Sequence, residues 1–199
     1  MRAAEQLIAQ HGLAQVSSRK IAEVAGNTNH SAVAYHFGGR DELIQAIVER
    51  QISQLEPRRS ALIDAVGADG TVLDYVRCIV LPMTDSLAEL PQPSWRARFL
   101  RQVLADPAIG QLFRGDPLLG PSLRRVGALV SDRLDDVSAP VLEGRFKLLA
   151  HMITDACAGY EERNSEHPDR ANWAFFGHFL TDATAGMLCA PDTTRAESE

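Results

Sequence analysis

The sequence predicts an all-α protein: an N-terminal helix-turn-helix domain followed by a second helical domain. Helix formers dominate the 199 residues, and no segment shows the sustained alternation of β-branched residues typical of strands. Three short helical patterns fit within the first 40 residues, and a glycine-containing turn separates the second from the third. Pro57 and the basic pair that follows it mark a junction, which predicts domains over residues 1–55 and 56–199.

The first two helices are predicted from apolar spacing and end signals. The first covers residues 2–11, because its apolar residues recur at helical spacing and Gly12 follows as a stop signal. The second covers residues 18–25, with Ser17 as its N-terminal cap. Its inward face is predicted to hold Ile21, Val24 and Ala25.

The next two helices complete the N-terminal domain. A short helix is predicted over residues 29–36, with Val33 inward, and the glycines after Phe37 end it. The fourth helix is predicted over residues 41–55, because acidic residues in its first turn favour the positive end of the helix dipole. Its apolar residues are Leu43, Ile44, Ile47, Val48 and Ile52.

The remaining helices follow the same signals, and prolines separate several of them. Pro82 is expected to kink its helix. The helices are predicted over residues 60–66, 71–90, 95–104, 118–134, 139–162 and 169–189.

Charge, cysteine usage and hydropathy narrow the class of protein. The net charge of −6 argues against a protein coated in basic surface, but residues 1–60 hold seven Lys or Arg against six Asp or Glu. The three cysteines have neither disulfide-like nor zinc-like spacing. The sequence has no membrane-length apolar run and no signal-peptide pattern. We therefore expect a cytoplasmic protein without metal or cofactor.

The start of the third helix carries side chains that can read DNA. In a helix-turn-helix the second helix of the motif enters the major groove. Asn29 can bond adenine, and His30 and Ser31 can reach base edges or phosphates. The pattern alone also fits an ordinary helical hairpin with a polar surface.

A longer signature within the first 50 residues resembles that of the TetR family. Three segments carry the resemblance, in the family's order: Ala4-x2-Leu7-Ile8-Ala9-x2-Gly12, Ser17-x-Arg19-x-Ile21-Ala22-x2-Ala25-Gly26 and Tyr35-His36-Phe37-Gly38-x-Arg40-x-Glu42-Leu43. The resemblance implies a bacterial DNA-binding regulator, a homodimer on operator DNA, and a small-molecule effector.

The same resemblance implies roles for individual residues. Ser17 would cap the second helix, Arg19 would lie near phosphates, and Thr28 would cap or flank the recognition helix. Phosphate contacts are implied for Tyr35, His36 and Arg40. Alternatives remain open for these three: a packing aromatic, a core histidine and a plain surface arginine.

The last helix has two apolar stripes, which predicts a dimer. One stripe holds Trp173, Phe176, Leu180 and Met187, and can bury against the chain itself. The other needs a partner and holds Phe175, Phe179, Ala183 and Gly186. Two helices from each subunit would form a four-helix interface, although a central helix within a monomer would explain the same pattern.

Two further features of the second half are open to more than one interpretation. His151 and Asp155, like His178 and Asp182, are one helical turn apart; local hydrogen-bonded pairs explain them better than a metal site. An apolar effector pocket, which the resemblance implies, would draw on aromatic and methionine side chains that equally suit a plain core. The candidates are Tyr75, Met83, Trp95, Phe99, Phe113, Leu119 and Met152.

The predicted function is a transcriptional repressor released from a palindromic operator by an effector. An enzyme is not predicted, since the sequence has no GxSxG, P-loop or HExxH motif. A small-molecule carrier would not need the signature above. A protein-interaction module with an inactive helix-turn-helix also fits the acidic net charge.

Overall fold

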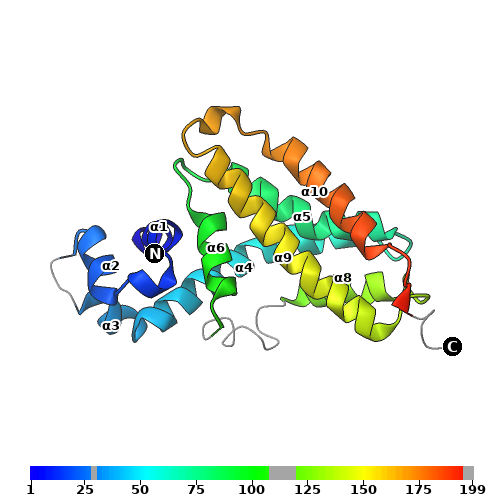
Figure 1. Cartoon of the computed structure of the whole chain (residues 1–199), viewed down its shortest axis with the longest axis horizontal. Coiled ribbons are helices and arrows are strands. Elements are labelled where there is room, and N and C mark those ends of the chain that lie inside the picture. Colours follow the sequence, from blue (N-terminus) through cyan, green and yellow to red (C-terminus); the bar gives the residue numbers. More distant parts are fainter. Residues whose placement is uncertain (28–30, 108–119, 195–199) are drawn as a thin grey trace. The chain divides into compact units, whose positions relative to one another are not determined.

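The computed structural model describes residues 1–27, 31–107 and 120–194. Those residues form nine α-helices and two short 3-10 turns, without a strand, which confirms the all-α prediction (Figure 1). The helices are α1 (Arg2–His11), α2 (Ser18–Val24), α3 (Ala32–Phe37), α4 (Arg40–Val66), α5 (Val72–Ala88), α6 (Arg96–Ala105), α8 (Pro121–Ser131), α9 (Ala139–Arg163) and α10 (Trp173–Leu188). None of the described helices is both long and apolar enough to cross a membrane.

The chain divides into two compact units. The first combines Met1–Gln54 with Leu90–Leu118 and Cys157–Arg170. The second combines the intervening segments, Leu55–Glu89 and Leu119–Ala156, with the C-terminal part of the chain from Ala171. Each unit gathers segments from several parts of the sequence, and the division into domains over residues 1–55 and 56–199 stays a prediction.

The first unit has its core between α1, α2, α3, α4 and α6. Helix α1 packs against α6, and α2 packs against α3. The core side chains are apolar and nearly inaccessible to solvent, and they come from all of these helices: Ala4, Leu7, Ile8, Ile21, Ala22, Val33, Leu43, Ile44, Ile47, Val48, Phe99 and Val103. The helix-turn-helix is therefore supported by a segment that lies more than 40 residues later in the sequence.

Helix α1 has the predicted bounds, and Gly12 ends it with a φ of 79°. The predicted inward face of α2 was partly wrong. Ile21 is buried, but Val24 is 48% exposed and Ala25 is exposed, whereas Ala22 is buried. Successive helical residues are rotated by about 100°. Val24 therefore lies about 60° from Ile21 on the side away from the buried Ala22, and Ala25 follows the last residue of the helix.

Helix α4 does not end before Pro57, which corrects the sequence-based prediction. It continues as one 27-residue helix, so the predicted helix over residues 60–66 is its last part. A proline inside a helix removes the hydrogen bond to the carbonyl four residues earlier. Ser53 and Pro57 are both exposed, so water can bond the Ser53 carbonyl. Burial of Ile63 beyond the proline favours continuation of the helix.

The second unit is built around the contact between α5 and α10, and α8 also packs against α5. A Cβ atom on Gly177 would lie 2.5 Å from the Thr84 hydroxyl oxygen, so the absence of a side chain there permits the close approach of the two helices. Pro82 lies inside α5 and is buried in this unit.

Candidate functional site

The helix-turn-helix is held by local backbone interactions. The Ser17 hydroxyl accepts a hydrogen bond from the Lys20 amide at 3.3 Å, as predicted for the cap of α2. Gly26 has a φ of 74° and turns the chain away from α2. Thr28, Asn29 and His30, three of the predicted DNA-contacting residues, lie outside the described residues.

Arg40 ties the start of α4 to the segment before α2. Its Nη1 donates to the carbonyl oxygens of Leu13 and Val16, both at 3.2 Å. Its Nε donates to Asp41 at 3.1 Å. The guanidinium thereby holds the segment that delivers Ser17 to its capping position.

The predicted contact residues Tyr35 and His36 are exposed at the end of α3. Tyr35 is 84% exposed, and the two rings meet edge to face at 5.1 Å between centroids. Neither ring lies in the core, so neither the packing aromatic nor the core histidine explains these residues. Arg19 and Ser31 are exposed as well. These polar side chains are accessible to a partner.

A buried carboxylate on α9 holds the start of α6 in the first unit. Glu161 is 5% exposed and accepts hydrogen bonds from the Ser94 hydroxyl at 2.7 Å and the Arg98 backbone and Nε at 3.1 Å. The Arg98 guanidinium also lies over the Trp95 ring at 4.4 Å. Two predicted pocket residues are thus accounted for in the first unit, since Phe99 belongs to its core and Trp95 stacks on an arginine.

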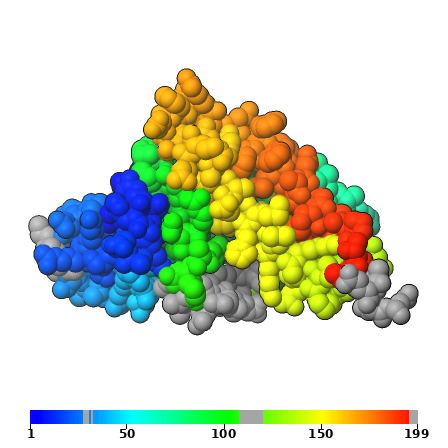
Figure 2. Space-filling model, in the orientation of Figure 1, coloured from blue at the N-terminus to red at the C-terminus, as the bar shows by residue number. Residues whose placement is uncertain are grey.

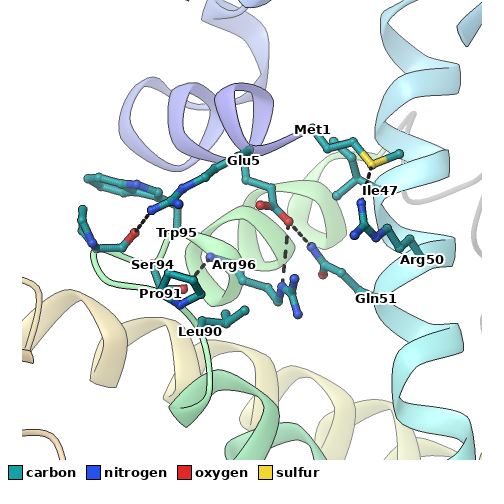
Figure 3. Close-up of a pocket in the computed structure, with 12 residues that line it drawn as sticks. Met1, Glu5, Ile47, Arg50, Gln51, Leu90, Pro91, Ser94, Trp95 and Arg96 are labelled. Atoms are coloured by element: carbon teal, nitrogen blue, oxygen red, sulfur yellow. Dashed lines mark hydrogen bonds and ion pairs between the residues drawn. The ribbon is translucent and has the colours of Figure 1, made fainter. Parts of the chain in front are cut away.

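The first unit contains a cavity of about 210 Å³ that both apolar and charged side chains line (Figure 3). Glu5 of α1 accepts a hydrogen bond from Gln51 of α4 at 2.7 Å and pairs with Arg96 of α6 at 3.9 Å. Trp95 lines this cavity too. Its lining includes three arginines, Arg2, Arg50 and Arg96, so it differs from the apolar pocket expected for an effector.

The second unit contains a larger and mainly apolar cavity of about 340 Å³ between α4, α5, α8 and α9. Its lining residues are Arg59, Ile79, Met83, Leu123, Arg124, Gly127, Phe146, Leu149, Ala150, Ile153 and Thr154.

Of the predicted pocket residues, Met83 lines this cavity. Tyr75 is fully buried, and its hydroxyl donates to the Gly67 carbonyl at 2.9 Å. Met152 is half-buried on α9 but does not line the cavity. Phe113 and Leu119 lie outside the described residues. The predicted set is therefore divided between two units.

Sequence reasoning missed Arg59, which is 5% exposed at the cavity. It was assigned with Arg58 to the junction after Pro57. A continuous helix places Arg59 one turn before the buried Ile63 and two turns after Ile52, on an apolar stripe. That spacing was the available signal, and ending the helix at Pro57 concealed it.

The two stripes of α10 differ in burial. Trp173, Phe176 and Leu180 are 8%, 7% and 3% exposed, so this stripe packs within the chain. Phe175 and Phe179 on the other stripe are 70% and 57% exposed. Ala183 and Gly186 are exposed too, as is Leu148 of α9. Both helices show an outer surface, in orange and yellow, in the space-filling view (Figure 2).

The His–Asp pairs and the buried cysteine do not form a metal or catalytic site among the described residues. His151, Asp155, His178 and Asp182 are exposed, and no group of three His, Cys, Asp or Glu suited to a metal occurs among the described residues. Burial, followed by the nearby Glu161, raises the pKa of the Cys157 thiol to about 12, which keeps it unreactive.

Comparison with known proteins agrees with the helix-turn-helix geometry. Residues 1–47 match the model of the family described as bacterial regulatory proteins, tetR family. A crystal structure described as a TetR-family transcriptional regulator from Rhodococcus sp. has a TM-score of 0.52 at 18% identity, covering 94% of this chain and 95% of that chain. This likeness shows the fold. No curated protein matches the chain.

These findings bear on the competing predictions of function. TetR proteins are regulators rather than enzymes, so the prediction that the chain is not an enzyme agrees with the match. The match covers the capped α2, the exposed end of α3 and the start of α4, where the candidate DNA contacts lie. Residues 1–47, which hold the helix-turn-helix, therefore match the DNA-binding domain of the TetR family of bacterial regulators.

Proposed function

We propose that the protein is a homodimeric repressor that binds a palindromic operator and releases it when a small effector enters the cavity of the second unit. The observation that carries the proposal is the set of exposed polar side chains on a TetR-type domain, Tyr35 and His36 above all. A regulator of this kind acts where the DNA is, in the cytoplasm.

The proposed DNA contacts fall into two groups. Arg19, Tyr35, His36 and Arg40 contact phosphates, and so position the domain without reading sequence. The remaining contacts come from the turn and the start of the recognition helix, where short polar side chains reach base edges. Those residues are Thr28, Asn29, His30 and Ser31.

Homodimerisation is supported by the exposed stripe of α10. Phe175 and Phe179 would remain in water in a monomer, whereas pairing with a second copy buries them. The dimer interface also includes Ala183 and Gly186, whose small size permits close helix approach. Two-fold symmetry would then place the recognition helices about 34–36 Å apart, or a multiple of this, to match a palindrome.

The effector switch is supported by the course of α4. This helix begins with Arg40 beside the helix-turn-helix and carries Arg59 at the apolar cavity. An effector changes operator affinity only if it binds the two states of the protein differently. A ligand that displaces α4 at Arg59 would meet this condition.

The test is DNA binding by the full chain, measured by fluorescence anisotropy on the region upstream of its own gene and on unrelated DNA of equal length. Specific binding that Tyr35→Ala weakens supports the proposal. Leu62→Ala is the control, because Leu62 is exposed on α4 in the second unit. Absence of binding to either DNA would favour the interaction module.

A further inference from the structure

The wall of the apolar cavity of the second unit contains a buried cation, the guanidinium of Arg59. Arg59 is 5% exposed, and its Nε meets no acceptor among the described residues. A buried N–H group without an acceptor is costly, and more so when it carries charge. Such a group in the wall of a cavity indicates that the cavity's occupant supplies the acceptor.

The nearest carboxylate does not fill this role. Glu56 accepts hydrogen bonds from the Ser122 amide at 3.1 Å and from the Ser122 hydroxyl at 2.9 Å, so both its oxygens are engaged. Burial lowers the pKa of Arg59 to about 10, partly offset by the charge of Glu56. Arg59 therefore remains positively charged at neutral pH.

The other lining residues indicate the sign and the size of a ligand. None of the lining residues that the structure describes is acidic, so Arg59 meets no negative side chain in the described wall of the cavity. The rest of the wall is mainly apolar, with Met83, Phe146 and Leu149. A volume of about 340 Å³ lies at the small end of the roughly 300–1,000 Å³ found for ligand pockets.

We propose that the cavity binds a small apolar organic acid, whose carboxylate accepts a hydrogen bond from Arg59 Nε while its hydrocarbon part lies among the aliphatic and aromatic side chains. A charge-assisted hydrogen bond satisfies the buried guanidinium, and desolvation of the hydrocarbon contributes the rest of the affinity. This inference rests on the proposed function, because it names the chemical class of the effector.

The test compares acids with neutral molecules of the same shape. Octanoate and 1-naphthoate are paired with 1-octanol and 1-naphthalenemethanol, and binding to the full chain is measured by thermal shift and calorimetry. We expect the acids to raise Tm more than the alcohols, because a ligand that binds only the folded state stabilises it. Arg59→Met should weaken binding of the acids roughly ten- to a hundredfold, with little effect on the alcohols.

Two variants distinguish binding through the Arg59 charge from binding that depends only on the space in the cavity. Arg59→Met replaces a buried unpaired charge by an apolar side chain of similar length, so the variant should fold. Gly127→Leu is the matched cavity control. A Cβ atom on Gly127 meets no described atom within 4 Å, and a larger side chain there should occupy the cavity and abolish binding of acids and alcohols alike.

The outcomes separate this inference from the proposed function. Acid binding that depends on Arg59 supports the inference whether or not operator affinity changes; unchanged operator affinity would contradict only the switch. The inference is overturned if no acid binds, if the alcohols bind as tightly as the acids, or if Arg59→Met leaves acid binding unchanged. DNA binding is measured separately, and none of these outcomes contradicts it.

Discussion

At the scale of single residues, Arg40 combines contacts that anchor its own domain with a proposed contact to DNA. Arg40 has a half-buried guanidinium that bonds two carbonyls of its own domain, and it is also proposed to contact phosphate. The sequence offered a phosphate ligand or a surface arginine at this position. The two carbonyl bonds could not be predicted, because they depend on where the chain before α2 passes the start of α4.

Replacement of Arg40 by alanine should therefore have two effects. Stability should fall by about 1–2 kcal/mol, because two carbonyls lose a donor. Operator affinity should fall for all sequences alike, and the slope of log K against log salt should become less steep by about one, as for a lost phosphate contact. Thermal denaturation and anisotropy over a series of salt concentrations measure the two effects.

Arg50→Ala is the control for Arg40→Ala, since Arg50 is an exposed arginine on the same helix. An unchanged salt slope in Arg40→Ala, together with lower stability, would show that Arg40 only anchors its own domain. Asn29 and His30, in contrast, should alter base preference when replaced by alanine, by roughly 1–3 kcal/mol at one position.

At the scale of elements, helix ends follow local rules in this chain. Helix α5 begins with a capping box: the Thr71 hydroxyl accepts from the Asp74 amide at 3.2 Å, and Asp74 accepts from the Thr71 amide at 3.0 Å. The hydrogen bond from the Thr71 hydroxyl, followed by that from its amide, lowers the pKa of Asp74. The first turn of α5 is thus stabilised by the ionised carboxylate.

Thr71→Ala should lower the stability of the protein by about 1 kcal/mol at neutral pH, a typical cost for loss of a cap. A carboxyl whose folded pKa is lowered adds stability above its ordinary pKa of about 4, and this is lost as pH falls through the folded pKa. The difference in free energy of unfolding between the wild type and Thr71→Ala should therefore become smaller below pH 4. Urea denaturation between pH 3 and 7 measures it, and a difference constant with pH would contradict this role of Asp74.

At the scale of the whole molecule, the exposed face of α10 is the feature that a single chain does not explain. The burial of Trp173, Phe176 and Leu180 leaves the opposite stripe, with Phe175 and Phe179, facing solvent. The sequence predicted both stripes from their spacing. It also assigned the stripe with Trp173 to the chain itself, and in the structure α10 packs against α5.

Phe179→Asp should convert the proposed dimer to a monomer, because burial of an unpaired carboxylate costs several kcal/mol. Light scattering at micromolar concentration should show half the wild-type mass. Operator affinity should fall as well, since each half-site alone binds weakly. Leu62→Asp places the same charge on an exposed apolar position of α4 and should leave the mass unchanged. A monomeric wild type would contradict the dimer itself.

The sequence by itself determined the helical class, the bounds of α1, the cap at Ser17 and the family of the DNA-binding domain. These features depend on helical periodicity, on capping groups and on glycine at a positive φ, all of which act over a few neighbouring residues.

Only the tertiary structure decided which residues line a cavity and which fill a core. Phe99 was a predicted pocket residue and lies in the core of the first unit; Arg59 was assigned to a junction and lies at the apolar cavity. The physical reason is that burial depends on packing between helices far apart in the sequence. Continuation of α4 through Pro57 likewise depends on the burial of Ile63 beyond the proline, which local propensity does not reveal.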